Sequence, residues 1–225
     1  MSLDFETALQ YYTYVCMATF VVGSILRFRH SQQTWKSGSS QMLRQGQLRL
    51  GSNLFHLGII TLFFSHTVGL LTPPWIYHAI GISAGFKQKM AIFGGGTAGF
   101  ICLVGLLILL HRRLSDPRIR KTSSFMDIYI LIHIAAQLAL GLGSLPISMS
   151  HPHGEQMLAL CDWVQRVATF RPAAGVLADV HWIFKAHIWG GVTLFGVFPF
   201  TRLVHALSVP ITYFFRPYQI VRKRR

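Results

Sequence analysis

Two pairs of histidines lie in or beside the most apolar parts of this chain. His56 and His66 are ten residues apart within the uncharged stretch 51–71, and His187 and His205 flank another apolar stretch near the C-terminus. Ionisable side chains are costly in a membrane segment, so histidines placed in this way predict a function. Histidine in a helix bundle is also the usual axial ligand of haem iron. Two such pairs at two depths would carry electrons across a bilayer.

Five long apolar stretches must position these histidines. Of the 225 residues, 52% are hydrophobic and only 12% are charged, which is about half the charge of a typical soluble domain. Each stretch has the ~20 residues that a helix needs to cross ~30 Å of hydrocarbon. The predicted spans are residues 8–26, 51–71, 90–110, 128–148 and 182–204. The sequence therefore predicts an all-α fold, a five-transmembrane-helix bundle in which residues 1–225 form a single integral membrane domain.

The basic residues are divided unevenly between the two ends of these predicted helices. The net charge is +14, and 16 of the 21 lysines and arginines fall in the connections after the first and third spans and in the C-terminal segment. Five of the seven acidic residues fall on the opposite side. The positive-inside rule then places the N-terminus outside (periplasmic) and the C-terminus in the cytoplasm. The basic excess indicates contact with anionic membrane lipid and does not indicate nucleic-acid binding.

This orientation pairs the histidines by depth. His56 is then inner and His66 outer on the second span, whereas His187 is outer and His205 inner on the fifth. We predict that His66 pairs with His187 and that His56 pairs with His205. A haem with two histidine ligands has no open position, which favours electron transfer. On straight helices, His56 and His66 would be ~15 Å apart along the axis, and His187 and His205 would be ~27 Å apart. The pairing therefore needs tilt, slanted haem planes or a bend within residues 190–199.

The longest connection, residues 149–181, is predicted to contain an interfacial helix on the outer side. Its apolar residues recur at helical spacing, with charged residues elsewhere on the helix. These apolar residues are Met157, Leu160, Cys161, Val164 and Ala168. The three cysteines of the chain, including Cys161, are scattered without metal-site spacing, and we interpret them as packing residues.

Two arginines are candidate residues for binding the haem propionates. Arg112 and Arg202 lie at the cytoplasmic ends of the third and fifth spans, where they can bind haem propionates or serve as positive-inside anchors. His133, alone in the fourth span, is interpreted as an ordinary core residue.

The alternative from a different class is a histidine-lined metal or proton transporter. Such pathways usually carry intramembrane acidic residues, and here only Asp127 is near a span.

Short runs along nearly the whole chain resemble the gamma subunit of respiratory nitrate reductase, a membrane cytochrome b. The matching runs are SSQML at 39–43, SNLFH at 52–56, LTP at 71–73, KQKMA at 87–91, RRL at 112–114, FPF at 198–200 and RLVH at 202–205. The resemblance implies that His56 and His205 hold an inner haem b and that His66 and His187 hold an outer haem b. It also implies a quinol site near the outer haem in which Lys87 is the catalytic residue.

The resemblance further implies a mechanism and partners. Menaquinol or ubiquinol would be oxidised on the outer side, near His66 and Lys87, with release of two protons. Electrons would pass through both haems to an iron–sulfur beta subunit and a molybdenum alpha subunit, which reduces nitrate on the cytoplasmic side of a bacterial inner (plasma) membrane. This chain has no ligand set for molybdenum or iron–sulfur clusters. Ser65 stands where the family is expected to have glycine, which bears on quinol preference. A dihaem cytochrome b subunit of another reductase is the nearest alternative.

Overall fold

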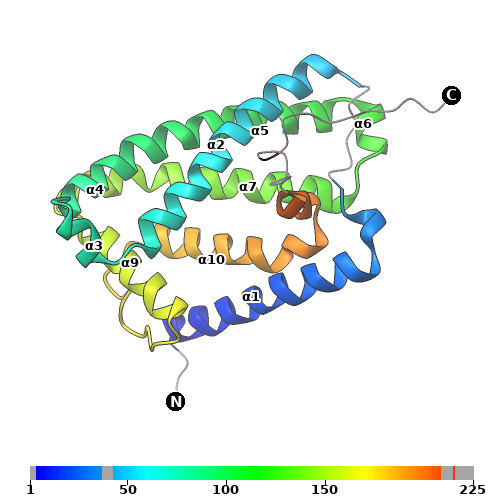
Figure 1. The fold of residues 1–225 in the computed structure, drawn as a ribbon. Helices are drawn as coiled ribbons and strands as arrows, with labels where there is room; N and C mark the ends of the chain where they lie inside the picture. The colour runs from blue at the N-terminus through cyan, green and yellow to red at the C-terminus, as the bar shows by residue number, and fades with distance from the viewer. Residues whose placement is uncertain (1–3, 37–42, 209–214, 216–225) are drawn as a thin grey trace.

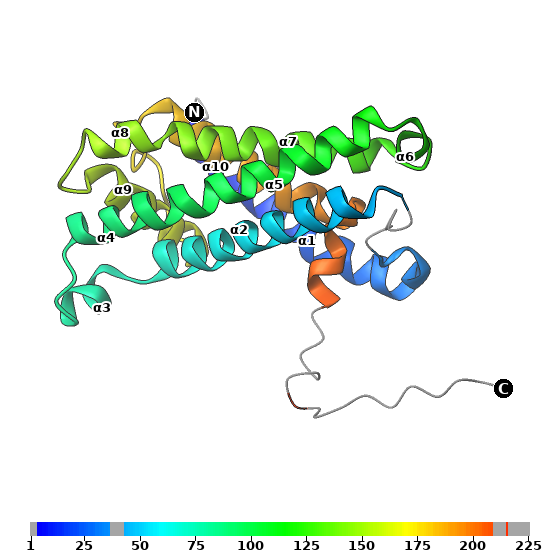
Figure 2. The same ribbon diagram turned by 90° about the horizontal axis from the view of Figure 1, so that it is seen from above.

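The computed structural model describes residues 4–36, 43–208 and 215. Five long helical spans pack side by side into one bundle (Figures 1 and 2). They are built on α1 (Phe5–His30), α2 (Gln45–Leu71), α5 (Gly96–Ser115), α7 (Phe125–Gly143) and α10 (Trp182–Val197). All regular structure in the described residues is helical, and five helices are long and apolar enough to cross a membrane. The prediction of an all-α bundle with five spans is confirmed.

Shorter helices close the two ends of this bundle. The segments α3 (Pro74–Ala79) and α9 (Glu155–Ala168) lie at the same end as the N-terminus, whereas α6 (Pro117–Lys121) lies at the opposite end (Figure 1). The predicted helix in the longest connection is therefore present as α9. A cluster of apolar side chains packs it against the first turns of α1 and α10. Its buried members include Leu9, Trp163, Val167, Leu177 and Phe184.

The third span is longer than its apolar stretch and contains a π-helical turn. The helix α4 (Ala84–Met90) continues through the π segment Ala91–Gly95 into α5, so the whole span covers Ala84–Ser115, or 32 residues. The predicted span began at residue 90, which would leave Lys87 outside the helix, and this boundary was wrong. The side chain of Ser83 accepts a hydrogen bond from the Phe86 N–H and caps a helix that already includes Lys87.

The helix that carries two of the histidines, α2, lies unusually close to α5. A Cβ added at Gly58 would lie 2.5 Å from the Cβ of Cys102, and one added at Gly105 would lie 2.3 Å from the backbone nitrogen of Phe55. Only small residues allow two helix backbones to approach this closely in a membrane. The contact therefore fixes His56 and His66 relative to α5.

The α-helix of the fifth span ends earlier than predicted, before it reaches His205. The sequence predicted one helix through residue 204, but α10 ends at Val197 and is followed by two short 3-10 segments, Phe198–Phe200 and Arg202–Ser208. Pro199 has no N–H to continue an α-helix, and Thr201 is extended at φ −113° and ψ 177°. The spacing of ~27 Å estimated for a straight helix therefore does not apply between His187 and His205.

Candidate functional site

The structure brings the four histidines together in the two predicted pairs. The ring centres of His56 and His205 are 6.2 Å apart, with 69° between the ring planes. Those of His66 and His187 are also 6.2 Å apart, with 45° between the planes. Two metal–nitrogen bonds of about 2 Å, with about 1 Å more from each nitrogen to its ring centre, span about 6 Å. Each pair is therefore spaced to accept one iron atom between its rings.

Three of the four rings are held in one tautomer by the backbone. The Nδ1 atoms of His56, His66 and His205 lie 2.7, 2.8 and 2.6 Å from the carbonyl oxygens of Ser52, Leu62 and Arg202. A carbonyl can only accept a hydrogen bond, so each Nδ1 carries the proton and each Nε2 keeps a lone pair for a metal. The fourth ring, His187, has a buried Nδ1 without a hydrogen-bond partner among the described residues.

Each pair offers two protein ligands and not a closed metal cage. In the part of the chain that the structure describes, no three His, Cys, Asp or Glu side chains gather around one point. The porphyrin of a haem supplies the other four nitrogens, so two axial histidines are the complete protein contribution. His56 and His66 are also exposed side chains, which leaves room beside them for a flat group. The residues present therefore fit two haems.

The pair formed by His66 and His187 lies in the wall of a cavity of about 740 Å³ between α2, α4, α7, α9 and α10. Ligand sites in proteins usually have 300–1,000 Å³ and a mostly apolar lining with a few polar groups. The lining here follows that pattern. Besides the two histidines, its polar and ionisable side chains include Ser65, Tyr77, Lys87, Gln88 and Gln137.

Lys87 is held at the edge of this cavity by α3 and α9. Its Nζ lies 4.1 Å from the centre of the Tyr77 ring and 3.8 Å from Cys161 Sγ. Burial raises the pKa of the Cys161 thiol, and the nearby Lys87 ammonium partly offsets this increase. The neutral thiol donates a hydrogen bond to the Gly69 carbonyl, at a distance of 3.5 Å. An ammonium has three N–H donors, and these two contacts leave one for the cavity. Lys89 is exposed and lies outside the cavity lining.

The neighbours of Lys87 were missed by sequence reasoning. Tyr77 is only 4% exposed, and its hydroxyl has no hydrogen-bond partner among the described residues. Cys161 was interpreted as packing alone, although its sulfur contacts the lysine. Neither residue has a distinctive spacing from Lys87 along the chain, so only the packing of α3 and α9 on α4 could reveal the cluster.

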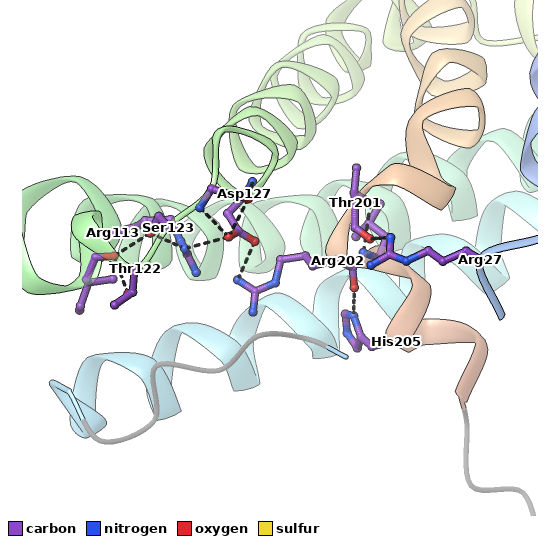
Figure 3. A network of polar contacts seen from close by, with 11 residues as sticks. Arg27, Arg113, Thr122, Ser123, Asp127, Thr201, Arg202 and His205 are labelled. Atoms are coloured by element: carbon purple, nitrogen blue, oxygen red, sulfur yellow. Dashed lines mark hydrogen bonds and ion pairs between the residues drawn. The ribbon is translucent and has the colours of Figure 1, made fainter. Parts of the chain in front are cut away.

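At the end of the bundle that carries His205, two arginines share one carboxylate (Figure 3). Arg202 Nη1 lies 3.7 Å from one oxygen of Asp127, and Arg113 Nη1 lies 3.8 Å from the other. Asp127 is fixed in place because it also forms the capping box at the start of α7 with Ser124. The two arginines carry one more unit of charge than the carboxylate that they share, so this part of the bundle is positively charged. Arg112 is buried and donates to the Leu43 carbonyl.

His133 occupies a structural position between α7 and α10. Its Nε2 lies 2.9 Å from the Gly190 carbonyl, and its Nδ1 lies 3.3 Å from the Tyr129 hydroxyl. Both ring nitrogens are therefore engaged with the protein. This arrangement agrees with its interpretation as a core residue.

Comparisons with known proteins agree over nearly the full length of the chain. The family model of the nitrate reductase gamma subunit matches residues 6–224. The chain belongs to the nitrate reductase gamma subunit family. It is 47% identical to the respiratory nitrate reductase 1 gamma chain of Escherichia coli (strain K12), over 95% of each chain. It is 37% identical to the nitrate reductase gamma chain of Bacillus subtilis (strain 168), over 94% of this chain and 95% of that one. With its five candidate spans, this family member is a multi-pass membrane protein.

Proposed function

We propose that this gamma subunit oxidises quinol in a respiratory nitrate reductase and holds two haems b between its histidine pairs. His66 and His187 would bind the outer haem, and His56 and His205 the inner one. The observation that carries this proposal is the 6.2 Å separation of both ring pairs, at two depths of one bundle. A haem held by two histidines at each site would supply a one-electron carrier.

The part of the cavity beside Lys87 is proposed as the quinol site, and the part between His66 and His187 would hold the outer haem. Quinol oxidation releases two electrons and two protons, and a positive charge beside a hydroxyl lowers its pKa. The third N–H of the Lys87 ammonium would donate to a quinol oxygen, while Tyr77 and Cys161 hold the ammonium in place. The apolar lining would take the quinone ring and the start of its isoprenoid tail.

The inner end would deliver electrons to partner subunits. A gamma subunit implies alpha and beta subunits in the same reductase. We propose an iron–sulfur beta subunit beside the inner histidine pair and a molybdenum alpha subunit beyond it, where nitrate is reduced. Arg112, Arg113 and Arg202 would bind the propionates of the inner haem, because their cationic groups gather at that end.

Haem content is the first test of the proposed function. The purified protein should contain two haems b per chain, because each histidine pair binds one. A pyridine haemochrome assay with a protein determination measures this ratio. The matched control is His133→Ala, which should keep both haems, because His133 contacts only protein groups among the described residues. A colourless, well-folded protein would favour a transporter instead.

Membrane orientation is the second test. The uneven distribution of basic residues predicts a cytoplasmic C-terminus and an outer location for the loop with α9. A reporter fused after Arg225 should be active only in the cytoplasm, and a tag inserted near Gly175 should be reachable from outside intact cells. The opposite labelling pattern would place the proposed quinol cavity on the cytoplasmic side.

A further inference from the structure

The last turn of α1 contacts the break that follows α10. The Arg27 guanidinium donates from Nη1 to the carbonyl oxygens of Pro199 and Thr201, at 2.6 and 2.8 Å. Figure 3 shows its side chain reaching across to Thr201, beside the segment that carries Arg202 and His205. A residue of the first span therefore binds the backbone that leads to a proposed haem ligand of the last one.

The donors of Arg27 are almost fully used within the protein. Its Nε donates to Thr34 Oγ1 at 3.2 Å and its Nη2 to the Thr34 carbonyl at 2.7 Å. With the two bonds to the break, four hydrogen bonds engage a group that has five N–H donors. This pattern differs from Arg113 and Arg202, whose guanidinium groups contact a carboxylate. Arg27 acts as a clamp on backbone and not as a receptor for an anion.

The break interrupts the regular hydrogen bonding of the last span, and Arg27 supplies donors to two of its carbonyls. The last carbonyls of any helix lack intrahelical partners, and the bilayer core offers no water to replace them. Thr201 is 2% exposed and Val204 is fully buried, so this backbone is enclosed by protein. Thr201 Oγ1 also accepts from the Leu203 N–H at 3.1 Å and so begins the turn that carries His205.

The packing around the clamp is tight. A Cβ added at Gly23 would lie 2.9 Å from Pro199 Cγ, so α1 rests directly on the proline of the break. Beyond α1, the Trp35 indole N–H donates to the Ser208 hydroxyl at the far end of the same 3-10 segment. The segment from Pro199 to Ser208 is thus held at both ends by residues 27–35, with His205 between them.

We propose that Arg27 is a positioning residue for the inner haem. By binding the Pro199 and Thr201 carbonyls, it fixes the turn that directs the His205 ring toward His56. This inference rests on the proposed function, because it assumes that His56 and His205 are the axial ligands. It predicts that Arg27 affects one haem and not the other, although its own side chain contacts no histidine among the described residues.

The test uses Arg27→Gln in the assembled reductase, with alpha, beta and gamma subunits. Gln removes most of the donors, so the inner site should lose ~10-fold or more in haem affinity, as is usual when the support of a metal ligand is removed. Haem content, redox titration and electron paramagnetic resonance of the low-spin haems measure the effect. The inner component, identified by its loss in His205→Ala, should be depleted or shifted, and the outer component should be unchanged.

Two further variants make the result decisive. Arg29→Gln removes an exposed arginine of the same helix and should match the wild type. Arg27→Lys keeps the charge with fewer, differently placed donors and should shift the inner haem less than Arg27→Gln does. Wild-type spectra and potentials in Arg27→Gln would overturn the inference. If Arg27→Gln loses both haems, the Arg27→Lys variant becomes the deciding measurement. A change in the spectrum or potential of the inner haem alone in Arg27→Lys would support the clamp, whereas no change, or equal loss of both haems, would overturn it. Retention of both haems in His205→Ala would instead refute the proposed ligand pair.

Discussion

Replacing either member of one histidine pair with alanine should remove the same haem and leave the other in place. His56→Ala and His205→Ala should lack the inner haem, and His66→Ala and His187→Ala should lack the outer one. A single remaining imidazole leaves one axial position open, so the haem content should fall from about two per chain to about one. Redox titration with optical spectra of the four variants measures which component is lost.

The pairing itself is tested by which variants share a spectrum. The two pairs come from α2 combined with either α10 or the 3-10 segment after it, so the variants should group by depth and not by helix. Loss of the same component in His56→Ala and His187→Ala would contradict the pairing. His133→Ala serves as the control for a membrane histidine that supports packing alone.

Lys87→Ala should slow electron entry from quinol while leaving both haems in place. A hydrogen bond from a charged donor contributes about 1.5–3 kcal/mol, which corresponds to a decrease of ~10- to 150-fold in the rate of quinol oxidation. The haem spectra should not change, because Lys87 is not an axial ligand. Stopped-flow reduction of the haems by a quinol analogue measures the rate directly.

Lys89→Ala is the matched control for this lysine. It lies two residues further along α4, is exposed, and is outside the cavity lining, so its loss removes the same charge without touching the proposed site. The control variant should retain nearly the wild-type rate. Equal quinol oxidation in both variants would remove Lys87 from the site.

The bundle and its histidine pairs could be predicted because the membrane imposes strong rules. Length and apolar composition identify five spans, and opposite helix directions bring His66 to His187 and His56 to His205. The spacing on the last span nevertheless conflicted with a straight helix. The sequence pointed to a bend near Pro199, but it did not indicate that the chain leaves the helix at Val197.

Contacts between distant segments could not be predicted in the same way. Arg27 reads as one more positive-inside anchor, because nothing in its local sequence records that the Pro199 carbonyl lies beside it. The same holds for Tyr77 and Cys161 around Lys87. Each of these roles depends on a backbone or a side chain brought close by tertiary packing, and hydropathy patterns contain no information on such neighbours.

The π-helical segment Ala91–Gly95 makes the third span tolerant of changes in chain length at one place. A π turn accommodates an extra residue within a continuous helix, so the faces of α4 and α5 are both kept. Deleting one residue there should leave a regular α-helix, in which four residues at ~100° each turn the chain about as far as the π segment does, so Lys87 should still face the cavity. The close contact of Gly105 with α2 lies beyond the segment and would be preserved. A single-residue deletion within Ala91–Gly95 should therefore be tolerated, whereas one within α5 would rotate the two parts of the span by ~100° relative to each other.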